Sequence, residues 1–196
     1  MGVRAYAAGK WLESSRDVSY SCHVSGELPR IFRALAEGGV QYLVVGGVAV
    51  VLHGYPRMTA DLDLVLSLAS ENVVRAVNAL SKLGFQPRPP VPFMDFADAA
   101  KRREWIEEKG LTVFSLWSPQ FPLTEIDCFV AEPFPFAEAY GRALSVPIEG
   151  IEVSVLGLVD LISLKRVAGR PKDLDDIEKL QAIHADGLAG GVDHEK

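Results

Sequence analysis

The chain has 196 residues, 48% of them hydrophobic and 23% charged, with 20 Lys and Arg against 26 Asp and Glu. A chain of this length and composition can bury a core of its own, which excludes extensive disorder and removes the need for a metal or disulfide staple. The net charge of −6 argues against a broad nucleic-acid-binding surface, which depends on clustered Lys and Arg.

Cysteine spacing and hydropathy indicate in which cellular compartment the protein is expected. Cys22 and Cys128 lie far apart and form no CxxC pair, which favours a reduced, cytoplasmic protein over a zinc or redox site. The N-terminus lacks the apolar segment of a secretory signal, and the longest apolar stretch, Tyr42 to Leu52, is too short to span a bilayer. We therefore expect a soluble protein with no membrane partner.

The first half of the chain alternates helices and strands. Residues 1–25 show no period and are predicted to be an N-terminal extension to a core domain at 26–156. Leu28, Ile31, Phe32 and Leu35 predict a helix that ends at Gly38–Gly39. A buried strand is expected before Gly46–Gly47, then a helix at 48–54, although its valines would equally suit a strand, and a second strand at 61–66.

The second half adds more strands and a helical end. Ser70 as N-cap and Gly84 as stop predict a helix, which the prolines at 87–92 separate from another at 99–109. Strands are expected at 111–117, at 123–130 and within 148–156. Two helices hinged at Gly169–Pro171 form a C-terminal helical segment at 157–186, followed by a flexible tail at 187–196. This order predicts an α/β (α+β) domain with a small mixed sheet flanked by helices.

Asp61 and Asp63 are the strongest chemical feature. Because side chains alternate along a strand, both carboxylates share one face while Leu62 and Leu64 point into the core. Two neighbouring acids repel unless a cation or water separates them, and such oxygen pairs suit Mg²⁺. The competing interpretation is a strand edge with two solvated acids.

Two further features complete a pattern. Asp127 and Glu125 share a face of a later strand, so Asp127 can converge on the first pair if the strands are neighbours, whereas Glu125 is better read as a solvated acid. Gly46–Gly47, between a strand and a helix, would let backbone N–H groups approach a phosphate, or would simply form a tight turn.

In order and spacing, these elements resemble the nucleotidyltransferase superfamily. The matching residues are Val45-Gly46-Gly47, Asp61-Leu62-Asp63-Leu64 and Ile126-Asp127-Cys128. More narrowly, residues 46–66 and the late motif LKRVAGRPKDLDDIEKL at 164–180 look like the AbiEii-type toxin branch of type IV toxin–antitoxin systems. The resemblance implies a metal-dependent enzyme that transfers an NMP from an NTP to a hydroxyl acceptor.

The same resemblance implies roles for individual residues. Asp61 and Asp63 would hold two Mg²⁺ ions, with Mn²⁺ as a substitute, and Asp127 would bind the catalytic metal and help deprotonate the acceptor. Gly46, Gly47, Lys165 and Arg57 would contact the nucleotide, and Asp173 is a weaker site candidate. The implied partners are an NTP, an acceptor hydroxyl on tRNA, protein or a small molecule, and an antitoxin protein; the two C-terminal helices could also form a homodimer contact.

Alternative interpretations accompany these roles. Lys165 would otherwise be a solvated helix lysine, Arg57 would anchor its connector, and Asp173 and Asp176 would only complement the helix dipole. His53 could be a cation at a helix C-terminus. A rival function is a non-catalytic module that binds nucleotide or a partner on the same fold; loss of a carboxylate would indicate it, and all three are present.

Overall fold

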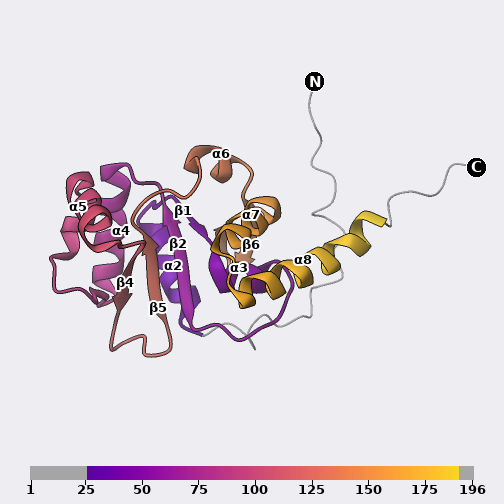
Figure 1. The fold of residues 1–196 in the computed structure, drawn as a ribbon. Helices are drawn as coiled ribbons and strands as arrows, with labels where there is room; N and C mark the ends of the chain where they lie inside the picture. Colours follow the sequence, from indigo (N-terminus) through magenta and orange to yellow (C-terminus); the bar gives the residue numbers. More distant parts are fainter. Residues whose placement is uncertain (1–25, 190–196) are drawn as a thin grey trace, which may run out of the picture.

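The computed structural model describes residues 26–189, which Figure 1 shows as one sheet with helices around it. The predicted N-terminal extension, including Cys22, lies outside the described residues, as do residues 190–196 of the predicted tail.

The first elements match the predicted alternation of helices and strands as far as residue 82, whereas a short strand and the 3₁₀ helix after it were not predicted. In chain order the elements are α2 (Leu28–Glu37), β1 (Tyr42–Val44), α3 (Gly46–Leu52), β2 (Asp61–Leu66), α4 (Ser70–Lys82), β3 (Gln86–Pro87) and a 3₁₀ helix, η2 (Phe93–Ala97). The valine-rich segment after Gly46–Gly47 is helical, because its residues are buried all around and find their hydrogen bonds within the segment.

The remaining elements build the rest of the sheet and the helical end. They are α5 (Ala99–Lys109), β4 (Val113–Trp117), β5 (Glu125–Phe129), α6 (Phe136–Gly141), β6 (Leu144–Ile148), β7 (Ile151–Val155), α7 (Leu158–Ala168) and α8 (Pro171–Ala189). Pro171 begins α8 as predicted, since a first helical position needs no N–H donor.

The seven strands form one mixed sheet in the order β3-β4-β5-β2-β1-β7-β6. The pairs β2·β5 and β1·β7 are parallel, and the other neighbours are antiparallel. This arrangement confirms the predicted fold class, a small mixed sheet with helices on its faces.

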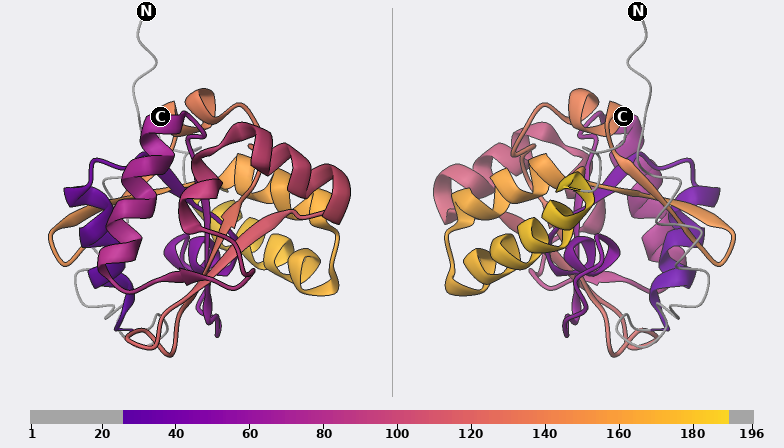
Figure 2. Two further views of the ribbon diagram at one scale, coloured as in Figure 1. Left: turned by 90° about the vertical axis from the view of Figure 1, so that its left-hand side faces the viewer. Right: turned by 90° about the vertical axis from the view of Figure 1, so that its right-hand side faces the viewer.

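Helices cover the sheet from both sides. Alternation places Phe114 of β4 on one face, where its ring stacks with those of Phe93, Phe96 and Trp105. The other face receives α3, against which α7 packs, with α8 packed on α7. Figure 2 shows α2 and α4 on one side of the strands and α7 and α8 on the other.

Further details differ from the sequence prediction. Helix α6 was not expected, and the single strand expected within 148–156 is a hairpin of β6 and β7. Its turn, Glu149–Gly150, has φ of 47° and 79°, so a glycine at the second position avoids the strain of a left-handed backbone. The predicted N-cap, Ser70, is instead the first residue of α4 and Ala69 is the cap, without a side-chain hydrogen bond.

Two further observations complete the fold. Helix α8 runs to Ala189, past the predicted end of the helical segment at 186. Within residues 26–189, no helix is long and apolar enough to span a membrane.

Candidate active site

The carboxylates of β2 and β5 converge because the two strands are parallel neighbours in matched register. Asp63 pairs with Asp127, and Asp61 with Glu125. Leu62, Leu64 and Ile126 alternate with these acids and are fully buried on the opposite face. The register therefore brings four acidic side chains to one face of two central strands, as the spacing predicted for Asp61, Asp63 and Asp127.

Asp63 lies at the centre of this acidic group. Burial, together with the charges of Asp127 and Asp61, raises the pKa of its carboxyl from 3.8 to about 6. A backbone hydrogen bond from Gly47 and the charge of Lys165 oppose the shift without cancelling it. The described residues around Asp63 therefore supply too little positive charge and too few hydrogen bonds to balance its ionised carboxylate.

The carboxyl of Asp127 is also partly buried and incompletely hydrogen-bonded. Its Oδ1 atom is buried and has no hydrogen-bond partner in the described part of the chain. Burial raises the pKa of its carboxyl, while a hydrogen bond from Ser115, its register partner on β4, acts in the opposite direction. A buried oxygen without a partner costs free energy, so this site is built to receive a further ligand.

Glycines at the start of α3 allow the close approach to Asp63. Gly46 has a φ of +62°, and a Cβ atom there would overlap the carboxylate of Asp63. A Cβ on Gly47 would lie 2.7 Å from Nη2 of Arg57 and would overlap the hydroxyl of Thr59. The glycine pair is therefore required by side chains that pack directly against this turn.

The acids fit a divalent cation completed by substrate. Among the described residues, no group of three or more His, Cys, Asp or Glu side chains is arranged to hold a metal ion by itself. Mg²⁺ takes one or two protein carboxylates and fills its other positions with water and substrate phosphates. Two adjacent carboxylates with raised pKa, one with an orphaned oxygen, match that requirement.

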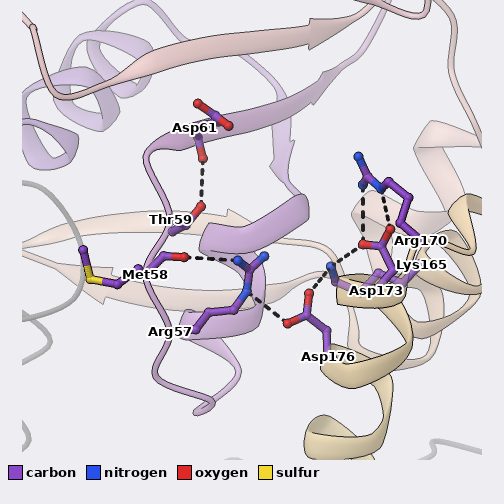
Figure 3. A network of polar contacts seen from close by, with 8 residues as sticks. All are labelled: Arg57, Met58, Thr59, Asp61, Lys165, Arg170, Asp173 and Asp176. Carbon is purple, nitrogen blue, oxygen red and sulfur yellow. Dashed lines mark hydrogen bonds and ion pairs between the residues drawn. The ribbon is translucent and has the colours of Figure 1, made fainter.

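A network of basic and acidic side chains lies beside the acids (Figure 3). Lys165 of α7 is only 4% exposed, and its Nζ lies 3.2 Å from Oδ1 of Asp173 and 2.6 Å from Oδ2 of Asp176. Nε of Arg170 lies 2.6 Å from Oδ2 of Asp173, and Nε of Arg57 lies 3.0 Å from Oδ1 of Asp176. Three cations and two anions leave this network with a net charge of +1.

The network corrects the expectations for Asp173 and Asp176. Both are 1% exposed and pair with cations, so they are buried ion-pair partners and do more than complement the dipole of α8. Although burial alone would raise it, hydrogen bonds from Arg170 and Lys165 hold the pKa of Asp173 below its ordinary value. The signal in the sequence was their spacing, which places both acids on the face of α8 that also carries the buried Ile177 and Leu180.

Lys165 and Arg57 also have defined environments. Lys165 is not the solvated lysine of the alternative interpretation, since its ammonium is enclosed by two carboxylates. Arg57 does anchor its connector, because it pairs with Asp176 and donates from Nη1 to the Met58 carbonyl at 3.2 Å. The same guanidinium covers Gly47, so both cations reach the edge of the acidic group.

Two other residues differ from their predicted states. Glu125 is not simply a solvated acid, because Nε and Nη2 of Arg88 donate to its two oxygens at 3.0 Å each. His53 is buried, and burial lowers the pKa of its ring, which donates from Nε2 to the Leu156 carbonyl at 2.8 Å. A neutral His53 contradicts its expected role as a helix C-terminal cation.

Comparisons with known proteins agree with this geometry. Residues 32–186 match the family described as "Nucleotidyltransferase of unknown function (DUF6036)". No curated protein sequence matches the chain.

Solved structures also share the fold. The lincosamide antibiotic adenylyltransferase LnuA, bound to lincomycin, superposes with a TM-score of 0.55 at 14% identity, over 82% of this chain and 98% of that one. ANT(2")-Ia in complex with adenylyl-2"-tobramycin superposes with a TM-score of 0.52 at 16% identity, over 83% of this chain and 90% of that one.

Proposed function

The chain belongs to the DUF6036 family of nucleotidyltransferases, and from this premise we propose that it is a metal-dependent enzyme that transfers an NMP from an NTP to a hydroxyl acceptor. The observation that carries the proposal is the group of Asp61, Asp63 and Asp127 on paired strands beside a network of net charge +1. In the described part of the chain these three acids have no ion pair, and they lie next to surplus positive charge, which suits a substrate that brings both cations and phosphates.

The chain's own residues divide the work. Asp61 and Asp63 would hold two divalent ions, Mg²⁺ or Mn²⁺, and Asp127 would bind the catalytic one. When bound, these ions neutralise charge on the attacking and leaving oxygens of the phosphoryl transfer. Gly47, Arg57, Arg170 and Lys165 orient the triphosphate, and within the network Arg57 and Arg170 are more exposed than Lys165.

Asp127 serves as the proton acceptor. Its buried Oδ1 atom has no hydrogen-bond partner among the described residues, so this carboxylate oxygen is available to take the hydroxyl proton of the acceptor. The hydroxyl oxygen then bonds to the α-phosphorus, the bond from that phosphorus to the bridging oxygen breaks, and pyrophosphate leaves with the electron pair.

Removal of Asp63 tests the proposal. Each divalent ion contributes several kcal/mol to the transition state, so Asp63→Ala is expected to lower transfer of label from α-³²P NTPs by roughly 10²–10⁴-fold. Asp175→Ala is the matched control, because Asp175 is an exposed aspartate on α8. Full transfer activity in Asp63→Ala would contradict the metal assignment.

The rival function is a non-catalytic binding module. It predicts intact NTP binding with no label transfer by the wild-type protein, whichever divalent ion is supplied and with cell extract as acceptor. The presence of all three carboxylates favours catalysis. The toxin role, the antitoxin partner and the homodimer expected from the AbiEii resemblance stay predictions, as does cytoplasmic localisation.

A further inference from the structure

A cavity of about 340 Å³ opens beside the candidate active site. Asp61 and Glu125, which pair at the start of β2 and β5, form one wall. Trp117 at the end of β4 and the loop that joins β4 to β5 form the other wall, and Phe121 and Leu123 of this loop are among the lining residues. The cavity therefore shares Asp61 with the acidic group, and its Glu125 lies two residues before Asp127 on the same face of β5.

The cavity and the basic network lie on opposite sides of the acids. In the sheet order β4-β5-β2-β1-β7, the cavity lies at the end of β4 and at the starts of β5 and β2. The network lies towards the other end, because α7 follows β7 and packs on α3. Figure 1 shows α7 and α8 on the side of the molecule away from β4.

This arrangement assigns the two sides different parts of the reaction. The attacking and leaving oxygens of a phosphoryl transfer are roughly in line across the phosphorus. With the triphosphate drawn to Arg57, Arg170 and Lys165, pyrophosphate leaves on the network side. The attacking hydroxyl then approaches from the cavity side, which is also the side of Asp127 and Glu125.

The cavity wall carries aromatic and aliphatic surface without surplus positive charge. Trp117 is 38% exposed and Leu123 is 66% exposed, so both present apolar surface to solvent. The guanidinium of Arg88 lies 5.6 Å from the centre of the Trp117 ring and is neutralised by both oxygens of Glu125. A phosphate backbone such as that of tRNA would need unpaired Lys or Arg there, whereas a ring or alkyl body can pack on Trp117 and Leu123.

We propose that this cavity is the acceptor site and that the acceptor is a small hydroxyl-bearing molecule with a ring or other apolar body. The inference rests on the proposed function. The acceptor's oxygen bonds to the α-phosphorus, its proton passes to Asp127, and pyrophosphate leaves with the electrons of the broken bond. The product is the nucleotidylated small molecule.

The test follows the label from each α-³²P NTP, supplied with Mg²⁺ and an extract of the source cells. After reaction, the extract is separated into a small-molecule filtrate, RNA and protein. We expect the label in the filtrate, where mass spectrometry identifies the adduct. Label in RNA or protein would overturn the acceptor class while leaving the proposed function standing, and no label in any fraction would overturn the proposed function itself.

Variants of the cavity wall test its location. Leu123→Glu places a charge on the apolar wall and is expected to lower transfer to the filtrate by at least roughly tenfold, through a higher KM for the acceptor. Trp117→Ala should act in the same direction. NTP binding with Mg²⁺ should stay unchanged in both.

Val167→Glu is the matched control, since Val167 is an exposed apolar residue on α7 outside the cavity. If both cavity variants transferred label as the control does, the cavity would not be the acceptor site. If they weakened NTP binding instead, the cavity would belong to the nucleotide.

Discussion

The acidic group and the basic network contain the same residue type in opposite electrostatic states. Asp63 and Asp173 both lose water on folding, and burial alone raises the pKa of each carboxyl. Asp173 has Arg170 and Lys165 as hydrogen-bonding cations, and its pKa falls below the ordinary value. Asp63 faces Asp61 and Asp127 instead, and its pKa rises to about 6.

This difference in pKa shows which of the two regions has its carboxylates paired with cations. In the network both carboxylates are paired with cations, so it can hold α7, α8 and the Arg57 connector together without a ligand, and one positive charge is left over for the triphosphate. The acidic group lacks its cations within the described residues, which costs stability and prepares a site. One region supports the fold and the other depends on what binds.

Removing Lys165 should disrupt the basic network, and we expect this change to cause the largest loss of stability. Lys165→Met leaves Asp173 and Asp176 buried with one cation fewer, and breaking a buried ion pair costs about 3–5 kcal/mol. We expect a loss of that size in the free energy of unfolding, measured by urea denaturation.

The control is a lysine with exposed partners. Lys179→Met removes only surface contacts to Asp175 and Glu178, worth at most about 1 kcal/mol. If the two lysine variants lost equal stability, the buried network would not be what holds α8 in place.

The acidic group should make the free energy of unfolding depend on pH when divalent ions are absent. The folded-state pKa of Asp63, about 6, exceeds its ordinary value of 3.8, so between these values the folded protein binds more protons than the unfolded chain. The contribution of Asp63 to stability therefore falls as pH rises from 4 to 6, by about 3 kcal/mol for a two-unit shift. Above pH 6 the loss is complete.

Comparison of wild type with Asp63→Asn isolates this contribution. His53, with its lowered pKa, acts in the opposite direction as pH rises towards 6.5, but it does so in both proteins. We expect urea denaturation to give the wild type the steeper decline, and Mg²⁺ at pH 7 to stabilise it more than the variant. Parallel curves of stability against pH for the two proteins would show that folding does not raise the pKa of Asp63.

The smallest expected effect is the difference in stability between Gly46→Ala and Gly39→Ala, which separates backbone strain from close packing against Asp63. Gly46 and Gly39 share a φ of +62°, yet a Cβ on Gly39 would meet no atom within 4 Å, whereas one on Gly46 would overlap the Asp63 carboxylate. Both Ala variants should lose about 1–2 kcal/mol from the left-handed backbone.

Gly46→Ala should lose a further 1–3 kcal/mol, roughly, from overpacking, and it should also lose transfer activity because Asp63 is displaced. Urea denaturation of the two variants side by side measures the difference. Equal losses would mean that Asp63 moves aside freely and that its position is not set by the glycine.

Much of the fold and the acids of the site could be predicted from the sequence. Leu28, Ile31, Phe32 and Leu35 define their helix by spacing alone, and all four are buried. The two-residue period of Asp61 and Asp63 determines that they share a face, whatever the strand packs against. The hairpin of β6 and β7 escaped prediction because Pro147 and the short strands weaken the pattern, and pairing across the turn supplies the missing stability.

What the sequence by itself determined is therefore local: element order, the faces of helices and strands, and the positions where glycine is needed. Only the tertiary structure decided which strands are neighbours, and so that Asp63 meets Asp127 and Asp61 meets Glu125. It also decided that Asp173 and Asp176 are buried against Lys165, and that a cavity adjoins Asp61. The reason is physical: burial and partner charge depend on residues distant in sequence, and they set the pKa and the chemistry of each carboxylate.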